Sequence, residues 1–335
     1  MKNCIDIHTS VREALTILEE SDIQTLFVLD GKGCLVGTLT DGDVRRGMLT
    51  GKSLDSTVET VMHRSFRYIR EGETSVEQLK ACRDQRIYII PVLGADGHIK
   101  DIIDLKRQKS VLPVDAVLMA GGKGERMRPL TETTPKPLLK VGEKAIIDHN
   151  IDRLKAYGIS RISVTVNYLA DQIIEHFKED KAVTCVREPK FLGTIGSLRF
   201  VENLGDEVLI LNSDLYTQID FEAFYLQFRR SEADMCIATT PYDVSIPYGI
   251  MDIQDGEVKG IREKPVFNYY ANAGIYLIKK TALGLIPKDR YFDATDLVNA
   301  LTASGGKVVH FPINGIWIDI GSFEEYKKAC ELESR

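Results

Sequence analysis

The chain has 335 residues, of which 44% are hydrophobic and 27% charged, and its formal net charge is −6. This length allows two to three domains that each bury a core, while the acidic balance argues against a general nucleic-acid binder, which needs a basic surface. No run of about 18 apolar residues could cross a membrane, the first ten residues lack the apolar core of a secretory signal, and six scattered cysteines indicate reduced thiols. We therefore expect a cytoplasmic protein with no membrane or nucleic-acid partner.

Residues 1–110 contain an internal repeat. Ser10–Glu13 and Ser75–Gln78 each have the spacing of a capping box at a helix N-terminus. An apolar strand follows each predicted helix, at 26–29 in the first copy and at 87–93 in the second. Each strand leads through a glycine-containing turn to a second strand, so two copies of one supersecondary unit are expected to pack on each other.

These repeats resemble a tandem pair of cystathionine-β-synthase (CBS) modules, also called a Bateman domain, with α+β modules at residues 1–56 and 57–110. In that family a Thr/Ser-x-x-Asp motif holds the phosphate and ribose of a nucleotide. The resemblance therefore implies a regulatory nucleotide at Thr40 and Asp43. The second copy has an acid, Asp101, in place of the hydroxyl, so the alternative that the repeats bind nothing stays open.

A parallel α/β sheet is predicted for the chain that follows a short linker at residues 110–113. Apolar strands alternate with amphipathic helices from this point onward. The predicted strands span 115–120, 162–166, 183–186 and 208–211, and the predicted helices span 145–157 and 170–177. This alternation indicates a Rossmann-like, doubly wound domain over residues 111–335, whose ligands should lie at the carboxyl ends of the strands.

A glycine-rich and basic segment follows the first of these strands. The glycines of Gly121–Thr131 let the backbone approach a phosphate chain, and six Lys and Arg side chains between Gly121 and Lys144 indicate a polyanion site. The segment is not a Walker A loop, because no Gly-Lys-Ser/Thr closes it. Nor is it a dinucleotide fingerprint, since Met127 occupies the place of the third glycine, which argues against an oxidoreductase.

The combined motifs resemble the sugar-nucleotide pyrophosphorylases, and within them the guanylyltransferases that act on mannose 1-phosphate. That family carries G-G-x-G-x-R-x-x-P-x-T followed by P-K-P, and the matching residues here are Gly121, Gly122, Gly124, Arg126, Pro129, Thr131 and Pro135–Pro137. Glu125 departs from the pattern, because the family commonly has a small hydroxyl residue there. An acid beside a triphosphate should point away or pair with Arg126 or Arg128. The resemblance covers about residues 113–330 and implies a GT-A-like domain.

The same resemblance assigns roles to residues along the whole domain. It places the nucleotide at Ala120, Gly121, Gly122, Gly124, Arg126, Lys136, Glu188, Gly193, Thr194 and Asp214. It places the sugar phosphate at Gly249, Glu263, Lys264 and Asn272, and a metal at Asp214 and Asp319. Arg126, Lys136 and Lys264 are implied to be catalytic, because their charges offset the repulsion between two phosphorylated substrates.

We therefore expect a Mg²⁺-dependent reaction in which a nucleoside triphosphate and a sugar 1-phosphate give a nucleotide sugar and pyrophosphate. No general base is required, since a sugar phosphate has a second pKa of about 6 and is already a nucleophile at neutral pH. The resemblance favours GTP with mannose 1-phosphate, or with glucosamine or N-acetylglucosamine 1-phosphate, as in the guanylyltransferases of legionaminic acid biosynthesis. A UTP-, CTP- or dTTP-specific enzyme and a catalytically inactive nucleotide sensor are the alternatives.

Two expectations concern the whole protein. The CBS pair implies a homo-oligomer, because such pairs tend to dimerise, and a nucleotide bound there would regulate or assemble the enzyme. Residues 320–335 show no hexapeptide repeat, so we expect no additional acyltransferase activity.

Overall fold

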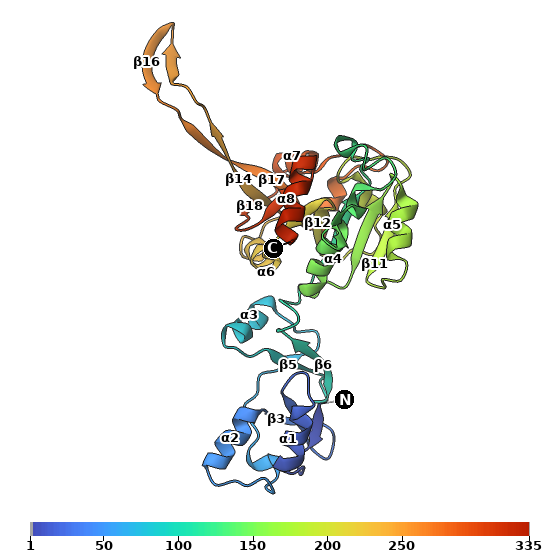
Figure 1. The fold of residues 1–335 in the computed structure, drawn as a ribbon, viewed down its shortest axis with the longest axis vertical. Helices are drawn as coiled ribbons and strands as arrows, with labels where there is room; N and C mark the ends of the chain where they lie inside the picture. Colours follow the sequence, from blue (N-terminus) through green and yellow to red (C-terminus); the bar gives the residue numbers. More distant parts are fainter. Residues whose placement is uncertain (1–2, 335) are drawn as a thin grey trace. The chain divides into compact units, whose positions relative to one another are not determined.

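A computed structural model describes residues 3–334 of the chain, which divides between Val111 and Leu112 into two units (Figure 1). Each unit has its own sheets and its own apolar core. No helix among residues 3–334 is both long enough and apolar enough to cross a membrane.

The first unit begins with a three-stranded sheet and two helices. Strand β2 is parallel to β1 and antiparallel to β3. The predicted capping box is confirmed, because the Ser10 hydroxyl accepts a hydrogen bond from the Glu13 N–H at 3.2 Å and Glu13 Oε2 accepts one from the Ser10 N–H at 3.1 Å. The elements are β1 (Cys4–Asp6), α1 (Val11–Glu19), β2 (Leu26–Leu29), β3 (Leu35–Leu39), α2 (Asp41–Leu49) and the 3₁₀ helix η1 (Val58–Thr60).

The second half of this unit repeats the arrangement. Strand β5 is parallel to β4 and antiparallel to β6, and the Ser75 hydroxyl accepts a hydrogen bond from the Gln78 N–H at 3.3 Å. Phe27 and Leu35 of the first copy share an apolar cluster with Leu93 and Ile99 of the second, which confirms that the two copies pack on each other. The elements are β4 (Ile69–Arg70), α3 (Val76–Asp84), β5 (Ile89–Leu93) and β6 (Ile99–Asp104).

The boundary between the two copies is placed at residues 56 and 57 by the sequence, and it stays a prediction. Val58 and Met62 pack into the apolar core of the first copy. The His63 N–H also donates to the Thr38 carbonyl at 2.8 Å. The chain therefore completes the first copy over residues 57–63 before the second copy begins at β4.

A seven-stranded sheet forms the centre of the second unit, in the order β11-β10-β7-β12-β17-β14-β18. The expected parallel strands β7, β10, β11 and β12 are confirmed. Only β17 departs from the predicted parallel arrangement, since it runs antiparallel to β12 and β14 within this sheet. The strands are β7 (Asp115–Ala120), β10 (Ile162–Val166), β11 (Val183–Arg187), β12 (Glu207–Asn212), β14 (Met235–Ser245), β17 (Val266–Lys279) and β18 (Val308–Pro312).

Helices and short ribbons complete the second unit around this sheet. Helix α7 buries Leu297 and Leu301 against the sheet face that carries Val117, Val208 and Ile278. The helices are α4 (Ile146–Ala156), α5 (Ala170–Phe177), α6 (Phe221–Arg230), α7 (Ala294–Ala303) and α8 (Phe323–Glu333). The ribbons pair β8 (Lys140–Val141) with β9 (Lys144–Ala145) and β13 (Leu215–Thr217) with β19 (Trp317–Asp319), and the 3₁₀ helices are η2 (Glu125–Met127), η3 (Lys136–Leu138), η4 (Gly196–Phe200) and η5 (Lys280–Leu285).

The strand order creates a switch point in this sheet. From β7 the chain builds outward through β10 to β11, and then returns to the other side of β7 with β12. Ligands of doubly wound sheets bind at such a point, beyond the carboxyl ends of the strands.

A long β-ribbon, which we call the arm, leaves the sheet and projects from the body of the second unit (Figure 1). Its base is formed by the outer parts of β14 and β17, and its tip by β15 (Ile250–Gln254) and β16 (Glu257–Arg262). The tip contains a β-bulge, because Asp252 pairs with Gly260 but Ile253 pairs with Val258. We define the arm as residues 239–272.

Candidate active site

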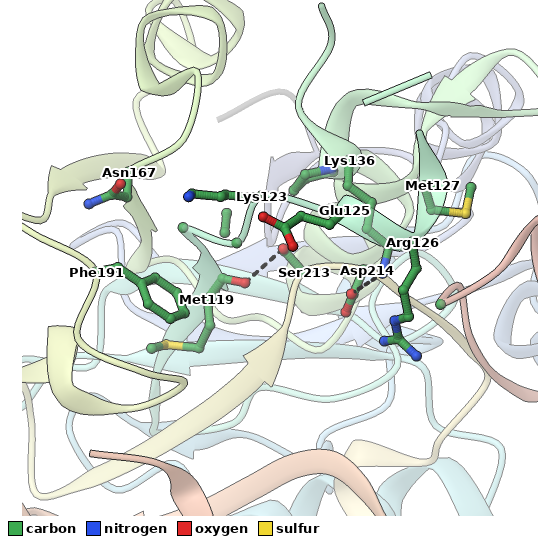
Figure 2. Close-up of a pocket in the computed structure, with 16 residues that line it drawn as sticks. Met119, Lys123, Glu125, Arg126, Met127, Lys136, Asn167, Phe191, Ser213 and Asp214 are labelled. Carbon is green, nitrogen blue, oxygen red and sulfur yellow. Dashed lines mark hydrogen bonds and ion pairs between the residues drawn. The ribbon is translucent and has the colours of Figure 1, made fainter. Parts of the chain in front are cut away.

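A cavity of about 580 Å³ lies at the switch point between β7 and β12 (Figure 2). Backbone and side chains from six segments line it: Met119–Met127, Lys136 and Pro137, Asn167, Phe191, Ser213 and Asp214, and Gly321. The ends of the two strands are tied together, since the Ser213 hydroxyl donates to the Met119 carbonyl at 2.7 Å. The cavity therefore occupies the edge of the sheet where the topology predicts a ligand.

The glycine-rich loop after β7 forms one wall of this cavity. Gly124 has φ +62°, and a Cβ there would lie 3.0 Å from Thr131 Cγ2 and 3.1 Å from Lys136 Cβ. A side chain at Gly124 is excluded by both its backbone conformation and this close packing. The Thr131 hydroxyl donates to the Gly124 carbonyl at 2.8 Å, so Thr131 holds the loop in place. The loop exposes its backbone to the cavity without side chains from Gly121, Gly122 or Gly124.

Lys136 and Asp214 line the cavity and form a charged cluster with Asp319, which does not itself line it. Lys136 is only 7% exposed, and its ammonium forms an ion pair with Asp214 Oδ2 (Figure 2). Asp319 lies beside them, because it pairs with Leu215 across the β13–β19 ribbon and the Ile320 N–H donates to the Asp214 carbonyl at 3.1 Å. Burial and then the neighbouring charge of Asp214 raise the pKa of Asp319.

A second cation lies close to this acidic pair. A Cβ at Gly321 would come 3.3 Å from both terminal nitrogens of Arg126, so the guanidinium lies against the backbone just after Asp319. The charge of Arg126 opposes the rise in the pKa of Asp319. Glu125, the departure from the family pattern, pairs with Arg128 at 3.9 Å, as one of the predicted arrangements requires.

The acidic pair is suited to a divalent cation. The two carboxylates lie close enough for one charge to raise the pKa of the other, and this repulsion would be relieved by a cation between them. Among residues 3–334, no group of three or more His, Cys, Asp or Glu side chains is placed to hold a metal. A cation held by Asp214 and Asp319 would therefore take its other ligands from waters and phosphate oxygens, as Mg²⁺ commonly does.

Glu188 is buried behind the glycine-rich loop and does not line the cavity. It is 5% exposed, and a Cβ at Gly121 would collide with Glu188 Oε1. Burial raises the pKa of Glu188 to about 7, although Glu188 Oε2 accepts a hydrogen bond from the Leu192 N–H at 3.3 Å. The structure thus places the Glu188 carboxylate against the backbone of Gly121, where a Cβ would displace it.

Gly193 and Thr194 are tied to the N-terminus of α7 and do not line the cavity. The Thr194 N–H donates to Asp293 Oδ1 at 2.8 Å, and the Thr194 hydroxyl accepts from the Ala294 N–H at 2.9 Å. Gly193 has φ +83°, and a Cβ there would lie 2.7 Å from the Phe292 carbonyl oxygen. From this loop it is Phe191 that lines the cavity.

The residues predicted for the sugar phosphate lie on the arm, apart from the cavity lining. Gly249 and Glu263 are neighbours, because a Cβ at Gly249 would lie 3.0 Å from Glu263 Oε2. Among residues 3–334, the side chains of Glu263 and Lys264 form no hydrogen bond or ion pair, and both residues are exposed. Asn272 is nearer to the sheet, where its Oδ1 accepts from the Gly274 N–H at 2.9 Å.

Several residues in the cavity lining were not predicted from the sequence. Asn167, Ser213, Phe191 and Met119 line it together with Lys123, which belongs to the predicted basic cluster. Asn167 follows the last residue of β10 directly, so the rule that ligands lie at carboxyl ends of parallel strands was sufficient to select it. Phe191 has no such signal, because it lies in a loop whose path depends on the contacts of Thr194 with α7.

A second cavity, of about 840 Å³, lies within the first unit between the two repeats. It is lined by Thr40 and Asp43, by the aromatic residues Phe66 and Tyr88, and by four cations, Arg46, Arg67, Arg86 and Lys106. Asp43 is already engaged, since its carboxylate accepts from the Thr40 hydroxyl at 2.6 Å and from Arg46 at 2.6 Å. Thr40 and Asp43 also form the capping box of α2, a role that the sequence spacing predicts equally well.

Comparisons with known proteins bear on both units. Residues 115–334 match the family described as nucleotidyl transferase, and residues 3–50 match the CBS domain. Mannose-1-phosphate guanylyltransferase 1 of Arabidopsis thaliana is 30% identical over 233 residues, which cover 65% of this chain and 64% of that protein. The chain spans 62 to 64% of the length of the mannose-1-phosphate guanylyltransferase relatives that it matches.

Solved structures resemble the second unit. HddC from Yersinia pseudotuberculosis is 28% identical and superposes with a TM-score of 0.52 over 66% of this chain and 99% of that chain. A structure of HddC complexed with GMP-PN gives a TM-score of 0.51 at 27% identity, with the same coverage of 66% and 99%.

Proposed function

Because this chain belongs to the nucleotidyl transferase family, we propose that it joins a nucleoside triphosphate to a sugar 1-phosphate and releases pyrophosphate. GTP is the proposed donor, and mannose 1-phosphate or glucosamine or N-acetylglucosamine 1-phosphate is the proposed acceptor. The observation that carries the proposal is the convergence of a bare backbone loop, Lys136 and Asp214 in one cavity, with Asp319 close beside Asp214. The choice of GTP is supported by the names of the relatives and by the GMP-PN complex of HddC.

The proposed reaction is a displacement at the α-phosphorus of the triphosphate. An oxygen of the sugar phosphate forms a new bond to this phosphorus, and the bond to the bridging oxygen breaks, so that its electron pair leaves with pyrophosphate. The attacking phosphate has a second pKa of about 6 and needs no base at neutral pH. What the protein must supply is alignment of two polyanions and opposite charge to offset their repulsion.

Residues of the cavity and of the arm can supply this alignment and this opposite charge. The backbone of Gly121, Gly122 and Gly124 would hold the phosphate chain, because no side chain keeps it away. Lys136 and Arg126 would offset the charge that develops on the leaving pyrophosphate. Asp214 and Asp319 would hold Mg²⁺, which when bound neutralises phosphate oxygens. Lys264, with Glu263 and Gly249, would orient the sugar phosphate.

A matrix of nucleoside triphosphates against sugar 1-phosphates, assayed by pyrophosphate release with Mg²⁺ present, tests this proposal. GTP with one of the three named sugars should give the fastest release. A clear preference for UTP, CTP or dTTP would keep the reaction class and overturn the donor. No release from any pair would overturn the reaction class and favour a nucleotide sensor.

We further propose that the cavity of the first unit binds a nucleotide. Its four cations and two aromatic rings provide charge for phosphates and flat surfaces for a base. Titration calorimetry of the full chain with adenine and guanine nucleotides is the test. Arg67→Ala should weaken binding at least about tenfold, the loss expected for one charged hydrogen bond. Arg12→Ala, which removes an exposed arginine paired with Asp55 outside this cavity, should leave binding unchanged.

A further inference from the structure

The arm carries more than half of the large hydrophobic residues that are exposed among residues 3–334. Of the eighteen large hydrophobic residues that are exposed among residues 3–334, ten lie between Tyr242 and Tyr270, and each of these is 38 to 73% exposed. Exposed hydrophobic residues normally occur singly on the surface of a monomer, and a gathering of them marks an interaction site. The arm therefore has the surface of an element that is covered by another protein surface.

The exposed apolar residues at the tip of the arm share one face. Met251 pairs with Ile261 and Ile253 pairs with Val258, and both pairs project from the same side of the ribbon because Met251 and Ile253 are two residues apart. The opposite face carries Asp252 and Gln254, with the half-buried Ile250 opposite Arg262 at its inner end. A two-stranded ribbon with one apolar face is not stable by itself in water, so this face needs a partner.

An apolar rim around the active-site cavity offers a matching surface. Two of the eight remaining exposed hydrophobic residues, Phe191 and Tyr291, lie there, and two more, Leu130 and Phe323, are close to lining residues in the sequence. Phe191 lines the cavity and its ring lies 6.0 Å from the ring of Tyr291. Phe323 follows the lining residue Gly321 by two positions, and Leu130 follows Met127 by three. The mouth of the cavity thus has an uncovered apolar border.

The arm is held away from the cavity of its own chain. Its base consists of seven consecutive residue pairs, from Thr239 opposite Asn272 to Ser245 opposite Val266, and these extend the two strands outward from the central sheet. Bending the arm back onto its own rim would break pairs in this ladder, at a cost for every backbone hydrogen bond lost. A second copy of the chain can receive the arm with the ladder intact.

We propose that the tip of the arm docks on the active-site rim of a second copy of this chain and delivers Glu263 and Lys264 to the partner's cavity. Each copy would give its arm and receive the other, as a closed two-fold arrangement requires. The cations that line the cavity, Lys123, Arg126 and Lys136, are then available to the triphosphate, while Lys264 serves the sugar phosphate. This inference rests on the proposed function for its catalytic consequence but not for the assembly itself.

Co-expression of two differently tagged inactive chains tests the exchange. One chain carries Asp214→Asn in the cavity and the other Lys264→Ala on the arm, and heterodimers are isolated through both tags. In the exchanged arrangement one of the two sites combines an intact cavity with an intact arm, so the heterodimer should show about half of the wild-type activity. If each arm serves its own chain, the heterodimer is inactive and the proposal is overturned.

The matched control reverses this outcome. A chain that carries both substitutions, paired with a wild-type chain, has no intact composite site when arms are exchanged and should be inactive. Half of the wild-type activity in this pair would overturn the proposal. Failure to isolate any heterodimer would also overturn the proposal, because two copies of the chain would then not form a stable dimer.

Sedimentation of the full chain decides the assembly without reference to catalysis. The wild type should be dimeric, Ile261→Asp should shift it toward monomer, and Asp252→Asn on the polar face should leave it dimeric. A monomeric wild type, or an Ile261→Asp variant whose dimer is as stable as the dimer of the wild type, would overturn docking through the tip. If the wild type releases no pyrophosphate, the proposed function fails while sedimentation still decides whether the arm joins two copies.

Discussion

Asp214 and Asp319 lie side by side but differ in what balances their charge. Asp214 is paired with the buried ammonium of Lys136, whereas Asp319 is held in a buried position against the charge of Asp214. Both would hold the metal in the proposed reaction. We therefore expect Asp214→Asn and Asp319→Asn each to lower the rate of pyrophosphate release at least about 100-fold.

The two variants should nevertheless differ in stability. Asp214→Asn leaves Lys136 without its charged partner and should lower the free energy of unfolding by about 1–3 kcal/mol. Asp319→Asn removes a carboxylate whose ionisation is opposed by burial, so it should cause no loss of stability at neutral pH. Urea unfolding of the wild type and both variants measures the difference. Equal stability of the two variants would contradict the ion-pair assignment.

Glu188 should make stability depend on pH. Its pKa is raised from 4.5 to about 7 in the folded protein, so the fold favours the protonated carboxyl. That stabilising contribution is fully present below pH 4.5 and is lost as the pH rises through about 7. Gln is uncharged at every pH, so Glu188→Gln should be more stable than the wild type near pH 8, by an amount on the order of 2–3 kcal/mol.

This gap between Glu188→Gln and the wild type should close as the pH falls toward 4.5, where the wild-type carboxyl is also uncharged. Urea midpoints of both proteins at several pH values measure it. A gap that stays constant with pH would mean that Glu188 does not titrate in this range. Because only the difference between two proteins is compared, the titration of other groups cancels.

At the scale of elements, two glycines that the sequence motifs treat alike should behave differently. Gly193 has φ +83° and lies against the backbone of Phe292, so Gly193→Ala should destabilise the protein by roughly 2–3 kcal/mol. Gly122 lies on the cavity wall, and a Cβ added there would meet no atom within 4 Å. Gly122→Ala should change stability by less than about 0.5 kcal/mol while it weakens triphosphate binding.

Thermal unfolding and nucleotide titration of both glycine variants separate the two roles. If Gly193→Ala unfolds like the wild type but loses nucleotide affinity, Gly193 belongs to the binding surface and its contact with α7 is secondary. If Gly122→Ala instead unfolds more easily than the wild type but keeps its nucleotide affinity, the loop needs glycine for its conformation and not for access to phosphate.

The elements themselves could be predicted well where a local pattern decides them. Strands β7 and β10 have the bounds that their apolar runs predict, and α1 begins at the expected capping box. The direction of β17 was not predicted, because strand direction depends on pairing with distant β12 and β14 and not on local periodicity. The same limit applies to the site: the resemblance of its motifs to the pyrophosphorylases selected Lys136 and Asp214, but only the fold places Glu263 and Lys264 on the arm.

At the scale of the whole molecule, a nucleotide in the first unit should change catalysis in the second. Regulation requires that the nucleotide bind two states of the enzyme with different affinity, and such coupling is commonly about 1–3 kcal/mol. We expect the bound nucleotide to shift the KM for GTP between about 5- and 150-fold. Kinetics with and without the nucleotide measure the shift.

Arg67→Ala provides the control for this coupling, since it changes the cavity of the first unit and leaves the second unit unaltered. The variant should keep the basal rate and lose the response to the nucleotide. Calorimetry identifies the nucleotides that bind the wild type. If none of them changes its KM for GTP, the first unit has a role in assembly only.

The β-bulge at the tip of the arm also limits how far copies of the chain can associate. Exposed ribbon edges commonly add further strands and grow into fibres. Here the extra residue at the bulge is Lys259, which is exposed and pairs with Glu257, so it interrupts the hydrogen-bonding edge and places charge beside it. Growth of a polymer along the strand edge is therefore unfavourable, and a molecule with so much uncovered apolar surface can remain a small, closed assembly.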